Sequence, residues 1–398
     1  MSRFLKLEQV CHKITDGSHN PPKGVELSEY IMLSSKNILD GEITFEKPRF
    51  LKHEDFLAEN KRTNIEIGDV LLTIVGTIGR CAVVDEIKQA FTLQRSVAVL
   101  KPDKEIILPK YLMFALQNMT AKFEGSARGV AQKGIYLKSL KQFEVFVPSL
   151  AEQQRIVAKL DAAFAEIDNI ATITEKKLKE ARKLYASGIT EIYFSNKSVP
   201  VVPLSTISKI KGGKRLPKGK KLQIEPTSYP YIRVSDFTNF GTIDEKSVQY
   251  ITEEIRSEIS RYTISSEDVY VSIAGTIGKT GIIPQSLDGA NLTENAAKIV
   301  LNEECDKNYF YFFTTSSSFE KQAIAQTRTA AQPKLALERL GAVELPIHNK
   351  LTQQAVAEKA RDLRDSVKLV ETLLNEKLLK TQALKSAILA QELQSEAA

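Results

Sequence analysis

The stretch SHNPPKG, at 18–24, holds the residue types closest to a catalytic motif. In amino-methyltransferases, an Asn-Pro-Pro motif followed by an aromatic residue binds the target amine, and the aromatic ring stacks on an extruded base. Here Lys23 replaces the aromatic residue, and the polar, turn-forming KITDGSH precedes the motif in place of a buried strand. The matching stretch of the second copy, KRLPKG at 214–219, has no Asn. We therefore interpret these prolines as stiff loop residues and not as an active site.

A second motif, IAGTIGKT at 273–280, ends like a phosphate-binding loop. That loop needs a glycine, four residues and then Gly-Lys-Ser/Thr, so that backbone N–H groups surround a phosphate. Ile273 replaces the first glycine, and the following GIIPQ predicts a strand where a helix is required. The glycines are predicted to shape tight turns between strands in both copies; they are Gly76, Gly79, Gly275 and Gly278.

Cysteine and histidine residues are too scattered to predict a metal site. Cys11, Cys81 and Cys305 contain no Cys-x-x-Cys pair and make an odd total, which suits a reducing cytoplasm. His12 and His19 lie seven positions apart without companion ligands. Neither paired carboxylates nor Ser-His-Asp or Cys-His patterns repeat across the copies. We expect no catalytic site, no metal and no cofactor on this chain.

Length and charge bound the class of protein. With 398 residues and 42% hydrophobic composition, the chain can form two or more domains. Its net charge of +6 permits an anionic partner without establishing one. No apolar run approaches the roughly 20 residues of a membrane span, and the N-terminus has no signal-peptide pattern. We expect a cytoplasmic protein that makes no membrane contact.

Internal repetition is the most informative feature of the sequence. GDVLLTIVGTIGR at 68–80 returns as EDVYVSIAGTIGK at 267–279, an offset of 199. Further identities recur at an offset of 200, among them Arg128 with Arg328 and Gln132 with Gln332. The pair Gln-Gln also returns, at 153–154 and 353–354. The chain therefore consists of two copies of a unit of about 200 residues.

The residue pattern of each copy changes once, after Pro148 in the first copy and after Pro346 in the second. Before each proline, β-branched runs are broken by Gly, Pro and Asn, which predicts a mixed α/β domain. After each proline the sequence is helical and nearly free of Gly and Pro. We predict five segments: a first mixed domain at 1–148, a spacer helix at 149–197, a second mixed domain at 198–346, a second spacer helix at 347–394 and a tail at 395–398.

Both helical segments carry a narrow apolar stripe with the three- and four-residue spacing of a coiled coil. The stripe contains Ile156, Leu160, Ile167, Ile170 and Leu184 in the first segment, and Val356, Leu363, Val367, Val370, Leu374, Leu384 and Ile388 in the second. Charged residues fill the other faces. We predict that the helices pair with each other as an antiparallel coiled coil; the alternative is that each packs into its own domain. Polar residues interrupt the stripes and are expected to set the register: Thr174, Lys177, Lys377 and Thr381.

Basic and polar loops make DNA a plausible ligand. KIKGGKRLPKGKK, at 209–221, holds seven Lys or Arg and no acid, which suits a phosphate backbone; the alternative is a solvated loop. Base reading requires polar side chains on short, rigid loops, although ordinary polar turns look similar. The predicted DNA-binding residues of the first copy are Ser18, Lys23, Lys36, Gln94, Arg95, Arg128, Gln132 and Lys133. Those of the second copy are Lys211, Lys214, Arg215, Lys218, Glu294, Asn295, Arg328, Gln332 and Lys334. The sequence pairs Gln94 and Arg95 with Glu294 and Asn295.

The order domain, helix, domain, helix resembles the specificity subunit of type I restriction–modification systems. The Gly-Thr-Ile-Gly turns, PSLAEQQRIVAKLDAAFAEID at 148–168, SDFTNFGTID at 235–244 and TDGSHNPP carry the resemblance, which covers essentially the whole chain. Two wordings depart from the family: LPIHNKLTQQAVAEKA at the second helix and TLQRS in the first domain.

The resemblance implies a non-catalytic subunit with two target recognition domains, each reading one half of a bipartite sequence in double-stranded DNA. Two modification subunits would supply S-adenosylmethionine and the active site for adenine methylation. Restriction subunits would join them, with Mg and ATP also bound by the partners. Two other functions stay open from the residues: a self-sufficient DNA methyltransferase and a structural coiled-coil scaffold.

Overall fold

A computed structural model describes residues 3–128, 133–328 and 334–394. The chain forms two compact units: the first contains residues 1–173 and 377–398, and the second contains residues 174–376. Two long helices, α6 (Leu150–Phe194) and α12 (Lys350–Gln394), each contribute a stretch to both units. None of the helices in the described ranges is both long enough and apolar enough to cross a membrane.

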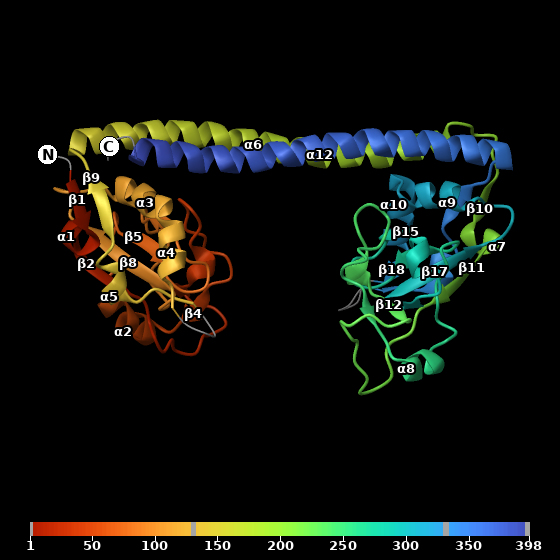
Figure 1. Ribbon diagram of the computed structural model, residues 1–398, viewed down its shortest axis with the longest axis horizontal. Coiled ribbons are helices and arrows are strands. Elements are labelled where there is room, and N and C mark those ends of the chain that lie inside the picture. The colour runs from red at the N-terminus through yellow and green to blue at the C-terminus, as the bar shows by residue number, and fades with distance from the viewer. Residues whose placement is uncertain (1–2, 129–132, 329–333, 395–398) are drawn as a thin grey trace. The chain divides into compact units, whose positions relative to one another are not determined.

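The first unit is a mixed α/β domain (Figure 1). Its strands are β1 (Arg3–Lys6), β2 (Cys11–Asp16), β3 (Tyr30–Leu33), β4 (Arg49–Leu51), β5 (Val70–Thr73), β6 (Cys81–Val83), β7 (Phe91–Leu93), β8 (Val97–Pro102) and β9 (Glu144–Val147). Its helices besides the long ones are α1 (Leu7–Val10), the short 3₁₀ helix η1 (Ser35–Asn37), α2 (His53–Thr63), α3 (Pro109–Asn118), α4 (Thr120–Ser126) and α5 (Leu137–Leu140). An antiparallel sheet has the order β2-β8-β5-β6, a second sheet has the order β4-β3-β7, and β1 pairs with β9.

Apolar runs become the central strands of the first unit. Every residue of β5 is buried, as are the first four of β8, which explains why neither run alternates with polar residues. Helix α3 starts with Pro109 at its first position, where the missing N–H costs nothing. It lies between the sheet and α6 (Figure 1), where Phe114 packs edge-on against Phe164.

The second unit repeats this topology. Its strands are β10 (Val201–Pro203), β11 (Ser208–Gly212), β12 (Pro230–Ile232), β13 (Gln249–Tyr250), β14 (Val269–Ser272), β15 (Thr280–Ile282), β16 (Asn291–Leu292), β17 (Ala296–Leu301), β18 (Thr327–Arg328), β19 (Lys334–Leu335) and β20 (Glu344–Pro346). Its shorter helices are α7 (Leu204–Ile207), η2 (Val234–Asp236), α8 (Glu253–Glu258), η3 (Gln285–Leu287), α9 (Lys307–Thr314), α10 (Ser317–Ala325) and α11 (Leu337–Leu340). The sheet orders β11-β17-β14-β15 and β13-β12-β16 and the pair β10-β20 match those of the first unit. The predicted mixed α/β class and the internal repeat are confirmed.

The first Gln of each Gln-Gln pair fastens a long helix to its own domain. The Gln153 side-chain amide donates to the carbonyls of Ile106 and Pro148, both at 2.9 Å, and its Oε1 accepts from the Leu108 N–H at 2.8 Å. Gln353 repeats this arrangement with Glu304, His348 and the Asp306 N–H. Both glutamines are fully buried, so these bonds are protected from water.

The long helices pair antiparallel in each unit. In the first unit, Lys159 bonds Glu392 at 2.7 Å and Lys385 bonds Asp168 at 3.0 Å, so partner numbers fall on α12 as they rise on α6. In the second unit, Arg182 bonds Glu371 at 2.7 Å. Ile156, Leu160, Ile167 and Val356 are buried, and Ile170, Leu363, Val367, Leu374 and Ile388 are half-buried. The predicted antiparallel pairing is confirmed.

Three residues assigned to the stripe lie outside it. Leu184, Val370 and Leu384 are exposed, by 69%, 44% and 48%. Two of them have a less exposed neighbour at a different phase: Tyr185, next to Leu184, is half-buried, and Thr381, three positions before Leu384, is buried. Apolar side chains also occur on the solvent-facing sides of these helices. A stripe assigned from apolar residues alone is therefore wrong where the inward-facing residue is polar or aromatic. Of the interrupting residues, Thr174 and Thr381 are buried, whereas Lys177 and Lys377 are exposed.

Candidate nucleic-acid interface

One backbone framework carries the polar loops of both units. In each unit, a glycine crosses the loop that precedes β8 or its counterpart β17. The two backbone segments approach so closely that a Cβ on Gly17 would lie 2.1 Å from the Leu93 carbonyl oxygen. A Cβ on Gly213 would lie equally close to the Thr293 carbonyl oxygen. Only glycine fits such crossings. The next residue, Ser18 or Lys214, then donates its backbone N–H to this loop.

The hydrogen bonds of this loop align the two units one residue differently from the alignment that the sequence predicted. The Val97 N–H donates to the Gln94 carbonyl at 3.0 Å, and the Ala296 N–H donates to the Thr293 carbonyl at 3.1 Å. Gln94 and Arg95 therefore correspond to Thr293 and Glu294. The pairing with Glu294 and Asn295 is wrong, because it applied the offset of the later matches to a part of the chain that still runs at 199.

The Gly-Thr-Ile-Gly segments are turns within antiparallel strand pairs, β5 with β6 and β14 with β15. All four glycines have positive φ: Gly76 at 85°, Gly79 at 96°, Gly275 at 76° and Gly278 at 88°. Gly278-Lys279-Thr280 runs directly into β15, where a phosphate-binding loop would continue as a helix.

The prolines of SHNPPKG have their carbonyls occupied. Arg49 Nη1 donates to the Pro22 carbonyl at 2.9 Å and reaches the Pro21 carbonyl at 3.5 Å. A motif that bound a target amine would keep the first proline carbonyl available. This geometry supports the interpretation of the segment as a stiff loop, at whose edge Lys23 is exposed. The expectation that no buried strand precedes it is wrong, because KITD, at 13–16, forms the end of β2, where Ile14, Thr15 and Asp16 are buried.

In the first unit, several predicted DNA-binding residues gather around one hollow of about 450 Å³. The Arg95 N–H donates to the Ser18 carbonyl at 2.9 Å, and Ser18 forms a bridge with Gln94. The hollow is lined by Asp16, His19, Arg62, Ile74, Val75, Arg95, Arg128, Gly134, Ile135, Tyr136, Leu137 and Lys138. Its wall thus contains Arg95 and Arg128, two of the predicted residues.

The other predicted residues of the first unit lie around this hollow or away from it. The Ser35 N–H donates to Ser96 Oγ at 3.1 Å, so η1, with its exposed Lys36, adjoins the loop that carries Arg95. Lys133 is exposed beside Gly134, whereas Gln132 lies outside the described residues. No contact among the described residues joins Lys23 to the hollow.

Sequence reasoning missed Asp16, His19 and Arg62. Asp16 ends β2 and is 5% exposed, and its carboxylate bonds Arg62 from α2 and lies 2.8 Å from His19 Nε2. Their spacing carries no recognisable signal, because Asp16 and Arg62 are separated by 46 positions. Only the packing of α2 beside β2 brings them together.

The basic loop of the second unit is held in place by contacts. Arg215 Nε donates to Glu294 Oε1 at 2.6 Å, and Lys220 Nζ donates to Glu254 at 2.8 Å. The Lys214 ammonium lies 5.6 Å from the centre of the Tyr262 ring. Burial is the largest single influence and raises the pKa of Glu294. The hydrogen bonds that the carboxylate accepts, from Arg215 first, and the positive charge of Arg215 together outweigh burial, so this pKa is lowered overall.

Arg215 and Glu294, both predicted to contact DNA, are therefore bound to each other. Lys211 and Lys218 are exposed, and their side chains form no hydrogen bond or ion pair with another residue in the described ranges. The loop thus offers bare cations beside a compensated one.

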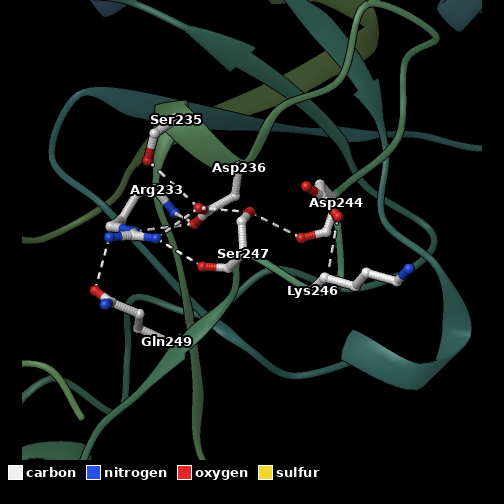
Figure 2. A network of polar contacts seen from close by, with 7 residues as sticks. All are labelled: Arg233, Ser235, Asp236, Asp244, Lys246, Ser247 and Gln249. Atoms are coloured by element: carbon white, nitrogen blue, oxygen red, sulfur yellow. Dashed lines mark hydrogen bonds and ion pairs between the residues drawn. The ribbon is translucent and has the colours of Figure 1, made fainter. Parts of the chain in front are cut away.

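Beside this loop, a polar network fixes η2, the counterpart of η1 (Figure 2). Arg233 bonds both carboxylate oxygens of fully buried Asp236, the Gln249 side chain at 2.6 Å and the Ser247 carbonyl at 2.7 Å. The charge of Arg233 is therefore used inside the protein. At the position of Lys36, the second unit has Ser235, which is exposed.

The remaining predicted residues of the second unit lie near the Gly275 turn. The exposed Asn295 accepts hydrogen bonds at its carbonyl from Ile273 and Ala274. Arg328 in β18 pairs with Lys334 in β19. Lys334 is exposed, and Gln332 lies outside the described residues. Within the described parts of the chain, no group of three or more His, Cys, Asp or Glu residues is arranged to hold a metal ion.

Two domains of one topology, each joined to a long helix and each carrying polar loops on one framework, define a class of sequence-reading protein. The pattern of the type I restriction modification DNA specificity domain matches residues 23–180 and 196–378. The chain belongs to this family.

Individual proteins agree with this assignment. The chain is 30% identical over 186 residues to the type I restriction enzyme EcoBI specificity subunit of Escherichia coli, a match that spans 46% of this chain and 38% of that subunit. It is 24% identical to the putative MjaX specificity subunit of Methanocaldococcus jannaschii, over 85% of this chain and 81% of the relative. A solved chain from a study of complex assembly and conformational transition of the type I R-M system has the same fold, with a TM-score of 0.69, 16% identity and coverage of 98% and 97%.

Proposed function

We propose that this chain is the non-catalytic specificity subunit of a type I restriction–modification complex. Its two domains, at 1–148 and 198–346, would each read one half of a bipartite target in double-stranded DNA. Partner subunits would then methylate adenine and cleave DNA at positions that this chain selects.

The observation that carries the proposal is a shared loop framework with unlike side chains. Gly17 and Gly213 cross their loops in the same way, yet the crossed loop presents Arg95 in one unit and Glu294 in the other. An uncompensated arginine binds acceptors such as phosphate or guanine oxygens, whereas a carboxylate binds a donor such as the amino group of cytosine N4. One framework with different chemistry is what two different half-sites require.

The same proposal assigns the partners and the location. Two modification subunits would dock on the long helices and the adjoining domains, and restriction subunits would join them. S-adenosylmethionine, Mg and ATP would be bound by those subunits. Because such a complex would act on cellular DNA, we propose a cytoplasmic location for the chain.

A domain exchange tests this function. Residues 1–148 are replaced by the corresponding region of a relative, and the methylated sites are mapped in cells that carry the complete system. We expect one half-site to change and the other to stay, because each unit has its own core. The reciprocal exchange of 198–346 should change only the other half-site.

Three results would contradict the proposal. A folded, assembled hybrid that loses both half-site sequences would show that the domains do not read DNA separately. Methyl transfer to DNA by the purified chain alone would identify it as a self-sufficient methyltransferase. A complex that shows no sequence preference in DNA binding would leave the scaffold function.

A further inference from the structure

In the first unit, one edge of the Arg62 guanidinium is hydrogen-bonded to Asp16, and the other edge is accessible from outside. Its Nε donates to the Asp16 carbonyl at 3.0 Å, and its Nη2 donates to Asp16 Oδ1. The second oxygen of this buried carboxylate lies 2.8 Å from His19 Nε2. The Arg62 side chain is nevertheless 49% exposed. Asp16 therefore fixes the guanidinium in the wall of the hollow without covering it.

The remaining donors of Arg62 match the edge of a guanine. A guanidinium has five N–H groups, and Asp16 occupies two of them. Those left on Nη1 and Nη2 form no hydrogen bond with any residue that the structure describes. They make a pair of adjacent donors, and guanine presents the matching acceptors, O6 and N7, in the major groove. Because Asp16 already orders the side chain, DNA binding costs little further rotamer freedom.

Charge separates Arg62 from the other cations of the hollow. Asp16 compensates Arg62, whereas Arg95, Arg128 and Lys138 have no carboxylate partner among the described residues. The uncompensated cations suit phosphates, whose attraction for protein is mainly electrostatic. The Arg62–Asp16 pair is nearly neutral, so its contribution to binding depends on the placement of its donors.

The second unit does not repeat these side chains. Gly212 ends β11 where Asp16 ends β2, and Glu294 stands at the position of Arg95. Helix α11 carries Glu338 at the position of Lys138 on α5. A purely structural device would be expected in both units, as the buried Gln153 and Gln353 are. A device confined to one unit fits the reading of one half-site.

We propose that Arg62 is a specificity-determining residue that reads a guanine in the half-site contacted by the first unit, with Asp16 as its positioning residue; this role rests on the proposed function of the chain. Arg95, Arg128 and Lys138 hold the neighbouring phosphates. The Arg62 N–H donors then decide which base pair is accepted at one position.

The test uses the full chain with its partner subunits. Cells carrying the complete system with Arg62→Gln are compared with wild type by mapping methylated sites, and Arg256→Gln in the second unit is the control. We expect one G·C position of the first half-site to accept other base pairs, with discrimination there reduced roughly 10- to 100-fold. Asp16→Asn should relax the same position to a smaller extent, and Arg256→Gln should leave the motif unchanged.

A second measurement keeps the result interpretable if methylation is lost altogether. The assembled complex is bound to target DNA in which the guanine at that position is replaced by 7-deazaguanine, which lacks the N7 acceptor. Wild type should lose affinity, and Arg62→Gln should respond much less. Thermal unfolding checks that each variant folds, and the double variant Asp16→Asn with Arg62→Gln removes the uncompensated carboxylate should the single variant be unstable.

Three results would overturn the role of Arg62. These are an unchanged motif in Arg62→Gln, a wild-type first half-site without a G·C pair, and a uniform loss of binding with a salt slope lower by about one, which marks a phosphate contact. Equal sensitivity of wild type and variant to 7-deazaguanine would count against it as well. A wild-type methylome with no bipartite motif would overturn the proposed function itself.

Discussion

Arg215 and Glu294 form an ion pair across 79 positions of the chain, with 2.6 Å between Nε and Oε1. The carboxylate also accepts from Thr293 Oγ1 at 3.0 Å through its second oxygen. Arg215 is 78% exposed on its side chain, and Glu294 is 26% exposed. The pair therefore sits at the surface of the second unit with its charge already balanced, a few residues from the unpaired Lys218.

The salt dependence of DNA binding should separate Arg215 from Lys218. Lys218→Ala should lower the slope of log affinity against log salt by about 0.9, because one phosphate contact and its counterion release are lost. Arg215→Ala should lower it by much less, since Glu294 already neutralises that charge. Binding of the assembled complex to unrelated DNA, titrated over a range of salt concentrations, measures both slopes.

Glu294→Gln should remove this difference between Arg215 and Lys218. With the carboxylate gone, Arg215 becomes an uncompensated cation, so the salt slope should rise by about one, and Arg215→Ala in this background should remove the gain. If Arg215→Ala changed the salt slope by the same amount with Glu294 and with Gln at position 294, the ion pair would not control access of Arg215 to phosphate.

Substituting the whole basic loop should weaken DNA binding without changing sequence choice. Lys214, Arg215 and Lys218 replaced together by Ala should reduce the salt slope by about two, because only the lysines carry uncompensated charge. The ratio of affinities for target and unrelated DNA should survive. Unchanged binding at every salt concentration would show that the loop is solvated surface without a role in DNA contact.

Gln153→Leu should destabilise the first unit. The substitution leaves the Leu108 N–H and the carbonyls of Ile106 and Pro148 without their partner in a buried site, which costs about 2–3 kcal/mol. Thermal unfolding of the full chain should show a lower midpoint for this unit. The neighbouring Gln154→Leu is the matched control, because Gln154 is exposed. Equal midpoints for the two variants would contradict the fastening role of Gln153.

Lengthening both long helices should widen the unread gap between the half-sites. Tyr185 bonds Thr315 at 2.9 Å, so an insertion must avoid that contact. Seven helix-forming residues placed after Glu175 and seven after Glu376 preserve the stripe and add about 10.5 Å. The gap should grow by about three base pairs, given ~3.4 Å per pair, while the half-sites stay the same. Mapped methylation sites with an unaltered gap would show that the helices do not set the spacing.

The sequence predicts what depends on repetition and period, and it fails where contacts are distant. The offset repeat predicts two like domains, and the spacing of Ile156 and Leu160 predicts a paired helix. The phase of that stripe is lost at Leu184, because burial there belongs to an aromatic neighbour. The one-residue error at Glu294 has a similar origin: a single offset hides a local insertion. Arg62 escapes notice because α2 meets β2 only in the folded chain.

The core of the first unit includes residues from the last helix of the chain, and this constrains how the protein folds as it is made. Leu389 and Leu393, near the end of α12, pack in the same cluster as Ile156 and Leu160 of the first unit. A ribosome must therefore translate the entire second unit, residues 174–376, before the first can close over its apolar stripe. At bacterial or eukaryotic synthesis rates that interval is on the order of ten seconds or more. During that time the nascent first domain exposes the apolar face of its long helix, a surface that chaperones bind. A ribosome that stalls before it translates the end of α12 would release a first domain with an incomplete core.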